Sequence, residues 1–456
     1  MTATELPGRG PALPGRLARS LRGAALAGAS VAGVSAAGAL VSVRAAYPRP
    51  PRAAPPEGWP PPKPVPRGRL AVAVVLGASG SVITDALGPY EVFARSPEFF
   101  VYTVSARPTA MLSGALAVVP DYSLGDVDAG TAPEPAVIVI PAVVSPAGRK
   151  EQPLREWLVR RAGRGAQLLG VCAGSRLLAA AGLLDGHRAT SHWSRIRGLE
   201  RSRPQVDWVR GQRYIQDGTI TTTAGVTSGV FGALRLVQQL VGAAEAQRVG
   251  RELAYPGWSL DGPTGIPAQR LAPRDLTNLL AALAPWRRPA LGVGLVEGAG
   301  EIDVAAPFEV YASSFAARTV PIAAGRTVMT RHGLRLVTAP ADAAAPRVDR
   351  LIVPGVPRAD QVDPRLAGWA AGRGLDIELP QADGEFSFDA MLRDLAAHAD
   401  RATASITAKS IEYPTSHLRL AGPAWPRRPT TLAALTIAAA IGAGFLPAAA
   451  VHRNRR

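Results

Sequence analysis

Cysteine is almost absent from the chain, whose 456 residues include only Cys172. A single thiol excludes a disulfide framework and any zinc site built on several cysteines. Histidine is also scarce, and its six copies lie without the short spacings by which histidines hold a metal ion. We therefore predict no metal ion and no other cofactor.

Lysine is the second shortage, with three Lys among the 51 basic residues. The formal charge is nevertheless +16, so the distribution of the basic residues along the chain decides whether this charge indicates a nucleic-acid partner. The excess lies at the two ends, in residues 1–69 and 421–456, whereas residues 70–420 are nearly balanced. A nucleic-acid-binding domain concentrates positive charge on a folded face. The sequence therefore predicts no nucleic-acid partner.

Charged residues are missing from two apolar segments, 23–43 and 430–451, which arginines border on both sides. About 20 uncharged apolar residues can cross a bilayer as a helix. The second segment is predicted to be a transmembrane helix, and the first either a transmembrane segment or a cleaved secretory signal. Because a basic start before an apolar stretch is typical of signal anchors, we expect a membrane protein with its globular part on the extracytoplasmic side.

A sequence pattern occurs twice between these ends. Residues 70–77 (LAVAVVLG) form a continuous apolar run typical of a buried parallel strand, and residues 291–297 (LGVGLVE) form another. Strands that alternate with helices predict a doubly wound parallel sheet in each copy. The second copy lacks most of the middle of the first. After each run an Asp, a Pro and a Glu recur at identical spacing, as Asp85, Pro89 and Glu91 and as Asp303, Pro307 and Glu309.

The segment that the second copy lacks carries the cysteine. Residues 166–171 (AQLLGV) are predicted to form another buried strand, followed by Gly170-Val-Cys172-Ala-Gly174 and a helix over 175–181. A strand that turns sharply into a helix through small residues is a nucleophile elbow. Since the N–H groups at a helix N-terminus stabilise a thiolate, Cys172 is the candidate catalytic nucleophile.

Two further residues are candidates for the same site. His192 could orient the thiol or act as an acid or base, or it could simply pack beside Trp193. Asp85 follows the first strand, so we expect it at the same carboxyl edge of the sheet, where it could share a proton with the thiol. Its recurrence as Asp303, in a copy without a cysteine, leaves a helix-capping role open.

These residues lie in segments that resemble a known family. Residues 170–193 (GVCAGSRLLAAAGLLDGHRATSHW), residues 85–93 (DALGPYEVF) and residues 223–229 (TAGVTSG) are similar to motifs of the ThiJ/PfpI family, the DJ-one-like branch of class I glutamine-amidotransferase-like proteins. The resemblance is closest to isonitrile hydratases and to the sensor domains of AraC-type regulators. It implies a flavodoxin-like fold with Cys172 as nucleophile and Asp85 as its acid partner, with His192 nearby.

The chain also departs from this family. The family usually has Pro-Gly-Gly at an oxyanion loop, where this chain has Pro141-Ala142-Val143. Two functions therefore stay open. One is a cysteine-dependent hydratase or hydrolase of the isonitrile hydratase, amidase, glyoxalase or peptidase type. The other is a ligand- or redox-sensing module without catalysis and without a DNA-binding domain. Either would take an unidentified small molecule, and the two copies would pair with each other or the chain would form a homodimer.

The predicted fold class is α/β, a flavodoxin-like doubly wound parallel sheet duplicated with a degenerate second copy and flanked by two hydrophobic membrane segments. Ten prolines within residues 48–66 predict an extended linker before the first copy. The predicted order is a basic tail (1–22), a transmembrane or signal segment (23–43), a Pro-rich linker (44–69), a ThiJ/PfpI-like domain with the cysteine elbow (70–260), a connector (261–289), the degenerate second domain (290–420) and a transmembrane helix (430–451).

Overall fold

The structure is a computed structural model that describes residues 24–33, 36–38, 41, 63–270, 272–276, 288–342 and 345–453. The chain divides into two compact units. One consists of Met1–Val43, Leu279–Arg287 and Arg427–Arg456, and the other of Arg44–Asn278 and Arg288–Pro426.

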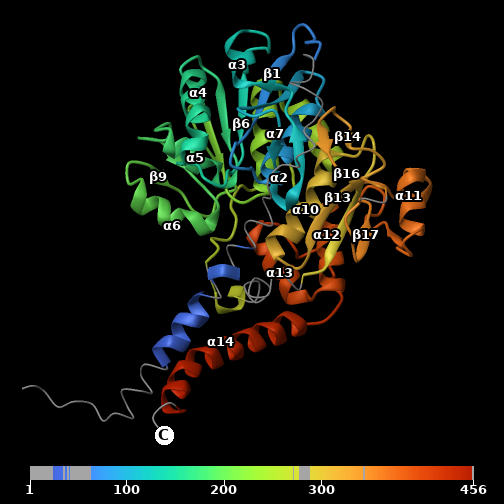
Figure 1. Cartoon of the computed structure of the whole chain (residues 1–456). Coiled ribbons are helices and arrows are strands. Elements are labelled where there is room, and N and C mark those ends of the chain that lie inside the picture. Colours follow the sequence, from blue (N-terminus) through green and yellow to red (C-terminus); the bar gives the residue numbers. More distant parts are fainter. Residues whose placement is uncertain are drawn as a thin grey trace, which may run out of the picture. The chain divides into compact units, whose positions relative to one another are not determined.

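The smaller unit contains the two apolar segments. Residues 24–33 are helical, and α14 runs over Arg427–Arg453 (Figure 1). Among the described residues, no helix combines the length and the apolar character that a membrane span requires. The prediction of two flanking membrane segments is therefore wrong, and with it the membrane localisation and the extracytoplasmic placement. The physical reason is that Ala and Gly make up at least half of each segment, so that absence of charge does not amount to strong hydropathy.

The first half of the larger unit contains a seven-stranded sheet with the order β10-β11-β7-β6-β1-β2-β5. All neighbouring strands are parallel except β10 and β11. The central strand β1 is apolar throughout and buried after its first residue, as expected for a parallel strand covered on both faces. The strands are β1 (Leu70–Leu76), β2 (Phe99–Ser105), β5 (Tyr122–Ser123), β6 (Val137–Ile140), β7 (Gln167–Gly170), β10 (Tyr214–Asp217) and β11 (Ile220–Thr223).

Helices cover both faces of this sheet (Figure 1). Alternate residues of β1 belong to two hydrophobic cores, because side chains alternate between the faces of a strand. Val72 lies in the core that includes α2, α7 and α8, and Ala71 lies in the core that includes α3, α4, α5 and α6. The helices are α2 (Ile83–Ala94), α3 (Leu124–Asp128), α4 (Gln152–Ala162), α5 (Ser175–Ala180), α6 (Trp193–Ser202), α7 (Ser228–Leu240) and α8 (Ala243–Leu253), and a short parallel pair joins β8 (Arg188–Ala189) to β9 (Asp207–Trp208).

The second half of the larger unit has a smaller parallel sheet with the order β16-β13-β12-β17-β18. The neighbouring strands β13, β12, β17 and β18 occupy the same positions in this sheet as β2, β1, β6 and β7 do in the sheet of the first half. The strands are β12 (Ala290–Leu295), β13 (Arg318–Ala323), β16 (Ala339–Pro340), β17 (Arg350–Ile352) and β18 (Ile377–Glu378), and the helices are α10 (Glu301–Ser314), α11 (Pro364–Ala371), α12 (Ser387–His398) and α13 (Arg401–Ser410).

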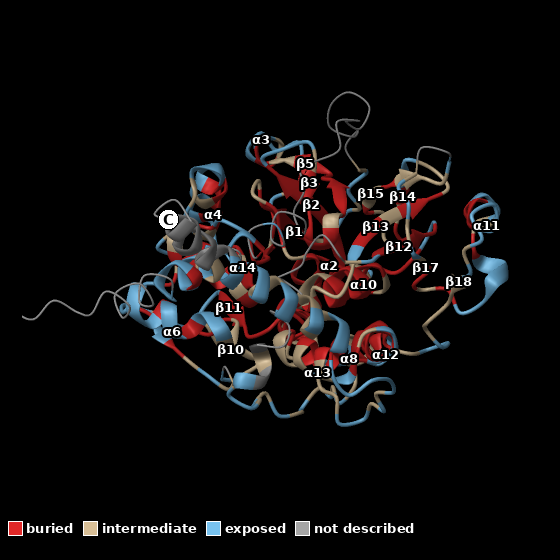
Figure 2. Cartoon of the chain, turned by 60° about the horizontal axis from the view of Figure 1, so that its bottom comes forward, coloured by how far each residue is buried: buried red, intermediate tan, exposed pale blue. Residues whose placement is uncertain are grey.

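The two halves share one core. Helices α2 and α10 contact each other, and both are buried almost all round, which is typical of a helix inside a protein (Figure 2). A four-stranded sheet with the order β14-β15-β4-β3 also joins the halves, with Val118 opposite Leu336 in the antiparallel pair of β4 and β15. The strands are β3 (Ala110–Met111), β4 (Ala117–Val119), β14 (Thr327–Met329) and β15 (Arg335–Val337).

Equivalent carboxylates reach across this interface in both directions. Glu91 of α2 accepts a hydrogen bond from the N–H of Ile302 at the start of α10, with a distance of 2.6 Å. Glu309 of α10 interacts in turn with the N–H and the hydroxyl of Thr84 at the start of α2. Each half therefore contributes to the surroundings of the other half's first helix. The boundaries that the sequence suggested for the separate domains stay a prediction.

Candidate functional site

Cys172 lies on a strained turn between β7 and α5. Its φ angle is +54°, in the left-handed region, which costs a non-glycine residue about 1–2 kcal/mol. Gly174 makes the turn possible, because a Cβ atom there would lie 2.1 Å from the carbonyl oxygen of Ile140. The strand, the tight turn and the helix thus have the geometry of an elbow.

Hydrogen bonds hold the backbone of this turn. The N–H of Cys172 donates to Thr223 Oγ1 at 3.2 Å. Its carbonyl oxygen accepts from the hydroxyls of Ser175 at 3.2 Å and Ser191 at 3.3 Å, and these two hydroxyls bond to each other at 2.8 Å. The strained conformation is therefore fixed from both sides, and the direction of the thiol is fixed with it.

Asp85 lies in the same site and is fully buried. Its Oδ2 atom accepts the N–H of Ala142 at 3.0 Å. Burial raises the pKa of Asp85 well above its usual value and repulsion from Glu309 adds to this, whereas hydrogen bonds from the Ala142 N–H and the Cys172 thiol lower it. The structure thus brings together Cys172 and Asp85, and burial favours the protonated form of the acid.

The thiol is in an unfavourable place for a thiolate. Cys172 is only 5% exposed. Burial raises the pKa of the thiol well above its usual value, and repulsion from Asp85, Glu412 and Glu309 adds to the effect, against a lowering by the Ala173 N–H. The expectation that the turn would depress this pKa does not hold, because burial and the carboxyl groups outweigh the backbone N–H group.

His192 is occupied elsewhere. Its Nδ1 atom bonds to Ser194 Oγ at 2.8 Å, and its Nε2 atom bonds to the carbonyl oxygen of Ser410 at 2.7 Å. Burial lowers the pKa of His192 to about 4, so the ring is neutral at neutral pH. Among the described contacts, none joins His192 to the thiol, and its bonds tie the start of α6 to the end of α13.

Glu412, in the second half of the chain, is a site residue that sequence reasoning missed. It has a φ angle of +54°, and its carboxylate accepts the N–H of Gly225. Gly225 has to be a glycine here, since a Cβ atom would lie 2.6 Å from Glu412 Cγ. Burial raises the pKa of Glu412 to about 7, against lowering by the Gly225 N–H and by Arg213. In the sequence it stands just before Tyr413-Pro414, as Ala254 stands before Tyr255-Pro256, and this weak similarity does not indicate a site residue.

Glu412 also lines a small cavity, and Cys172 is not among the residues that line it. This cavity of about 20 Å³ is lined by Ser191, Trp193, Ala224 and Glu412, among others. A single water molecule needs roughly 10–15 Å³ measured in this way. The cavity therefore has room for about one water molecule.

The second half has a different residue at the corresponding place. Gln381 follows β18, which pairs with β17 as β7 pairs with β6. Its Nε2 atom donates to Asp303 Oδ1 at 3.1 Å, and its Oε1 atom accepts the N–H of Gly355 at 3.1 Å. The hydroxyl of Ser387 also donates to Asp303 Oδ1. Asp303 is thus held by an amide and a hydroxyl, where Asp85 faces a thiol.

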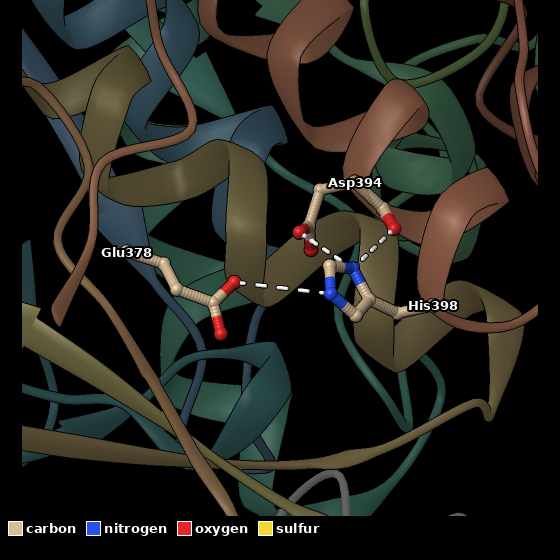
Figure 3. Close-up of side chains that lie close together, drawn as sticks. All are labelled: Glu378, Asp394 and His398. Atoms are coloured by element: carbon tan, nitrogen blue, oxygen red, sulfur yellow. Dashed lines mark hydrogen bonds and ion pairs between the residues drawn. The ribbon is translucent and has the colours of Figure 1, made fainter. Parts of the chain in front are cut away.

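One group of side chains in the described part of the chain is close enough to hold a metal ion: Glu378, Asp394 and His398 (Figure 3). His398 Nδ1 lies 3.0 Å from Asp394 Oδ1, and His398 Nε2 lies 3.9 Å from Glu378 Oε2. The guanidinium of Arg350 already bonds both carboxylates, at 2.8 Å for Asp394. A metal ion would have to displace this cation, so the group fits a partly buried ion-pair network better.

The parallel sheet, the elbow cysteine and the buried acid at its carboxyl edge define a class of α/β proteins with a thiol centre. Residues 71–239 match the family described as DJ-1/PfpI. Isonitrile hydratase of Pseudomonas putida is 36% identical over 176 residues, which cover 38% of this chain and 72% of that protein. The chain belongs to the DJ-1/PfpI family.

One further curated relative and two solved structures are similar to part of this chain. The HTH-type transcriptional regulator CdhR of Pseudomonas aeruginosa is 36% identical over 119 residues, so this chain spans only 32% of its length. Among solved structures, a ThiJ/PfpI family protein from Pseudomonas syringae is 26% identical, with a TM-score of 0.37, over 46% of this chain and 84% of that one. Drosophila melanogaster DJ-1beta is 20% identical, with a TM-score of 0.36, over 41% of this chain and 97% of that one.

Proposed function

We propose that the chain is a small-molecule-binding sensor module of the DJ-1/PfpI family, in which the Cys172 centre is closed to turnover. The observation that carries this proposal is the position of Glu412 beside the elbow. Its carboxylate bonds the N–H of Gly225, Cys172 is only 5% exposed, and the cavity that Glu412 lines holds about 20 Å³ without Cys172 in its lining. A substrate would need considerably more space, since ligand pockets usually measure about 300–1,000 Å³.

The electrostatics of the centre support the same proposal. A nucleophilic cysteine needs a lowered pKa, whereas three carboxyl groups and burial raise the pKa of Cys172. An oxyanion intermediate needs N–H groups that point to it and have no other partner. The N–H of Ala142 is in the loop where relatives have Gly-Gly, and it already donates to Asp85. Both parts of the catalytic apparatus are thus engaged in other interactions.

A cysteine-dependent hydratase is the second candidate, and one observation favours it. Cys172 keeps a φ angle of +54°, a costly conformation that a merely structural cysteine has no need of. A thiolate there would add to an electrophilic carbon, and Asp85, whose protonated form is favoured by burial, would supply a proton. The isonitrile hydratase of Pseudomonas putida makes an isonitrile the obvious substrate to try.

The test measures the hydration of an alkyl isonitrile to the N-alkylformamide by the purified full chain, with Cys172→Ser as the control. We expect no formamide above the level of the control. Iodoacetamide should label Cys172 slowly at pH 8, and faster in Glu412→Ala, because that change opens the site and removes a like charge. Turnover that depends on Cys172 would overturn the proposal in favour of the hydratase.

A further inference from the structure

A second cavity in the larger unit measures about 230 Å³. It lies at the place in the second half that corresponds to the Cys172 centre, beside Asp303 and Gln381. Glu91 and Ala254 of the first half also line it. Its volume is several times the roughly 30 Å³ that one water molecule occupies in the liquid, and it is below the range of drug-sized pockets, so it suits a small ligand.

The surroundings of Cys172 and of Asp303 differ at one pair of equivalent residues. Ala254 follows α8 and Glu412 lies just after α13, with φ angles of +53° and +54°, and each precedes a Tyr-Pro. The rings of the two tyrosines, Tyr255 and Tyr413, are 5.5 Å apart. The two residues are therefore equivalent, and each reaches the site of the opposite half. Glu412 brings a carboxylate near Cys172, whose pKa it raises, whereas Ala254 brings only a methyl group to the cavity beside Asp303.

Three of the five acidic side chains that line this cavity already have a cationic partner. Glu91 bonds Arg95 at 2.6 Å, Glu252 bonds Arg248 at 2.5 Å, and Glu385 bonds Arg393 at 2.5 Å. Of the other two, Asp383 is exposed, and so is Arg331, a cation that also lines the cavity and has no ion pair among the described residues.

Asp303 differs from them. Its described hydrogen bonds use Oδ1, from Gln381 and Ser387, and its carboxylate forms no ion pair with any of the described residues. A Cβ atom on Gly300 would lie 2.6 Å from Asp303 Oδ2, and one on Gly355 would lie 3.0 Å from Asp303 Cβ, so two glycines make room for this carboxylate.

We propose that this cavity binds a small organic cation, of the ammonium or guanidinium class, with its charge on Asp303. The inference rests on the proposed function, for which it supplies the ligand site and the ligand class. A carboxylate in a partly enclosed site attracts a cation more strongly than it does in water, because the effective dielectric constant is lower. Gln381 and Phe386 line the same cavity, and they offer an amide oxygen and an aromatic ring to the rest of a ligand.

The test is a calorimetric titration of the full chain with methylguanidinium, and with N-methylurea as a neutral molecule of the same shape. We expect saturable binding of methylguanidinium and at least about tenfold weaker binding of N-methylurea, since a hydrogen bond to a charged group contributes enough for this ratio. Asp303→Asn should weaken the binding of methylguanidinium by about the same factor. Asp85→Asn, the matched change in the first half, should leave it unaltered.

A filling variant gives a second test. Ala254→Glu places in this site the side chain that Glu412 places in the other, on a backbone that already has the same φ angle. It should abolish binding, and so should the uncharged Ala254→Met, with unfolding midpoints that show both variants to be folded. Absence of saturable binding to the wild type, or equal binding of N-methylurea, overturns the cation site.

The two proposals can fail separately. Isonitrile turnover that depends on Cys172, together with methylguanidinium binding that depends on Asp303, would overturn the sensor function and leave the cation site standing. The reverse result, with neither turnover nor binding, would overturn the cation site alone.

Discussion

Replacement of Glu412 by Gln tests the electrostatics of the closed centre. The pKa of Glu412 is raised from 4.5 to about 7, because burial disfavours its charged form. A carboxyl group whose pKa is raised by folding destabilises the protein once it ionises. Its cost is absent below the unfolded pKa, grows as the pH rises from about 4.5 to about 7, and is complete above that range. One pKa unit corresponds to about 1.4 kcal/mol, so the cost at pH 8 is about 3 kcal/mol.

Glu412→Gln keeps an oxygen for the Gly225 N–H but cannot ionise. Its free energy of unfolding should therefore match that of the wild type near pH 4.5 to within about 1 kcal/mol, and exceed it by about 3 kcal/mol at pH 8. Urea unfolding of both proteins at the two pH values measures this difference. A difference between the two proteins that is the same at pH 4.5 and pH 8 would refute the reasoning, because only titration of Glu412 makes it depend on pH.

Two further substitutions test the elbow and its acid. Asp85→Asn removes a carboxyl group that raises the pKa of Cys172, so iodoacetamide should label the thiol faster at pH 8 to 9; slower labelling would instead identify Asp85 as a group that activates the thiol. Gly174→Ala would place a Cβ atom 2.1 Å from the carbonyl oxygen of Ile140, so the urea midpoint should fall by the equivalent of several kcal/mol, about 3 or more. Gly198→Ala is its control, because Gly198 lies in α6 and has nothing within 4 Å of the new atom. This change should be neutral or stabilise by up to about 1 kcal/mol. Equal effects of the two changes would contradict the close approach at the elbow.

The elbow could be predicted from the sequence because its causes are local. A buried strand, small residues at the turn and a following helix all lie within a short stretch of about ten positions, as is usual for sequence motifs of this kind. The nearness of Asp85 to Cys172 was also predictable, since both follow parallel strands and such strands place their carboxyl ends at one edge. The pKa of the thiol was not predictable, because it depends on burial and on Glu309 and Glu412, which lie in the other half of the chain.

His192 and the terminal segments show two other limits of the sequence. A histidine near a cysteine in the chain suggested a partnership, yet its ring bonds Ser194 and the distant Ser410, and no local pattern could have indicated the second bond. The membrane prediction for 23–43 and 430–451 rested on the absence of charge. A membrane span also requires strong hydropathy over its whole length, which segments rich in Ala and Gly do not supply.

The joining of two halves in one chain explains why the two sites can differ. In a homodimer with twofold symmetry a residue that reaches the partner's site does so twice, so a change at that position alters both sites together. Here the equivalent positions are encoded separately, as Ala254 and Glu412, and each faces the other half. One site can therefore be closed over its cysteine while the other stays open around Asp303. The Glu412 carboxylate at one site and the Ala254 methyl group at the other are thus a single difference that would be enough to give the two sites separate roles.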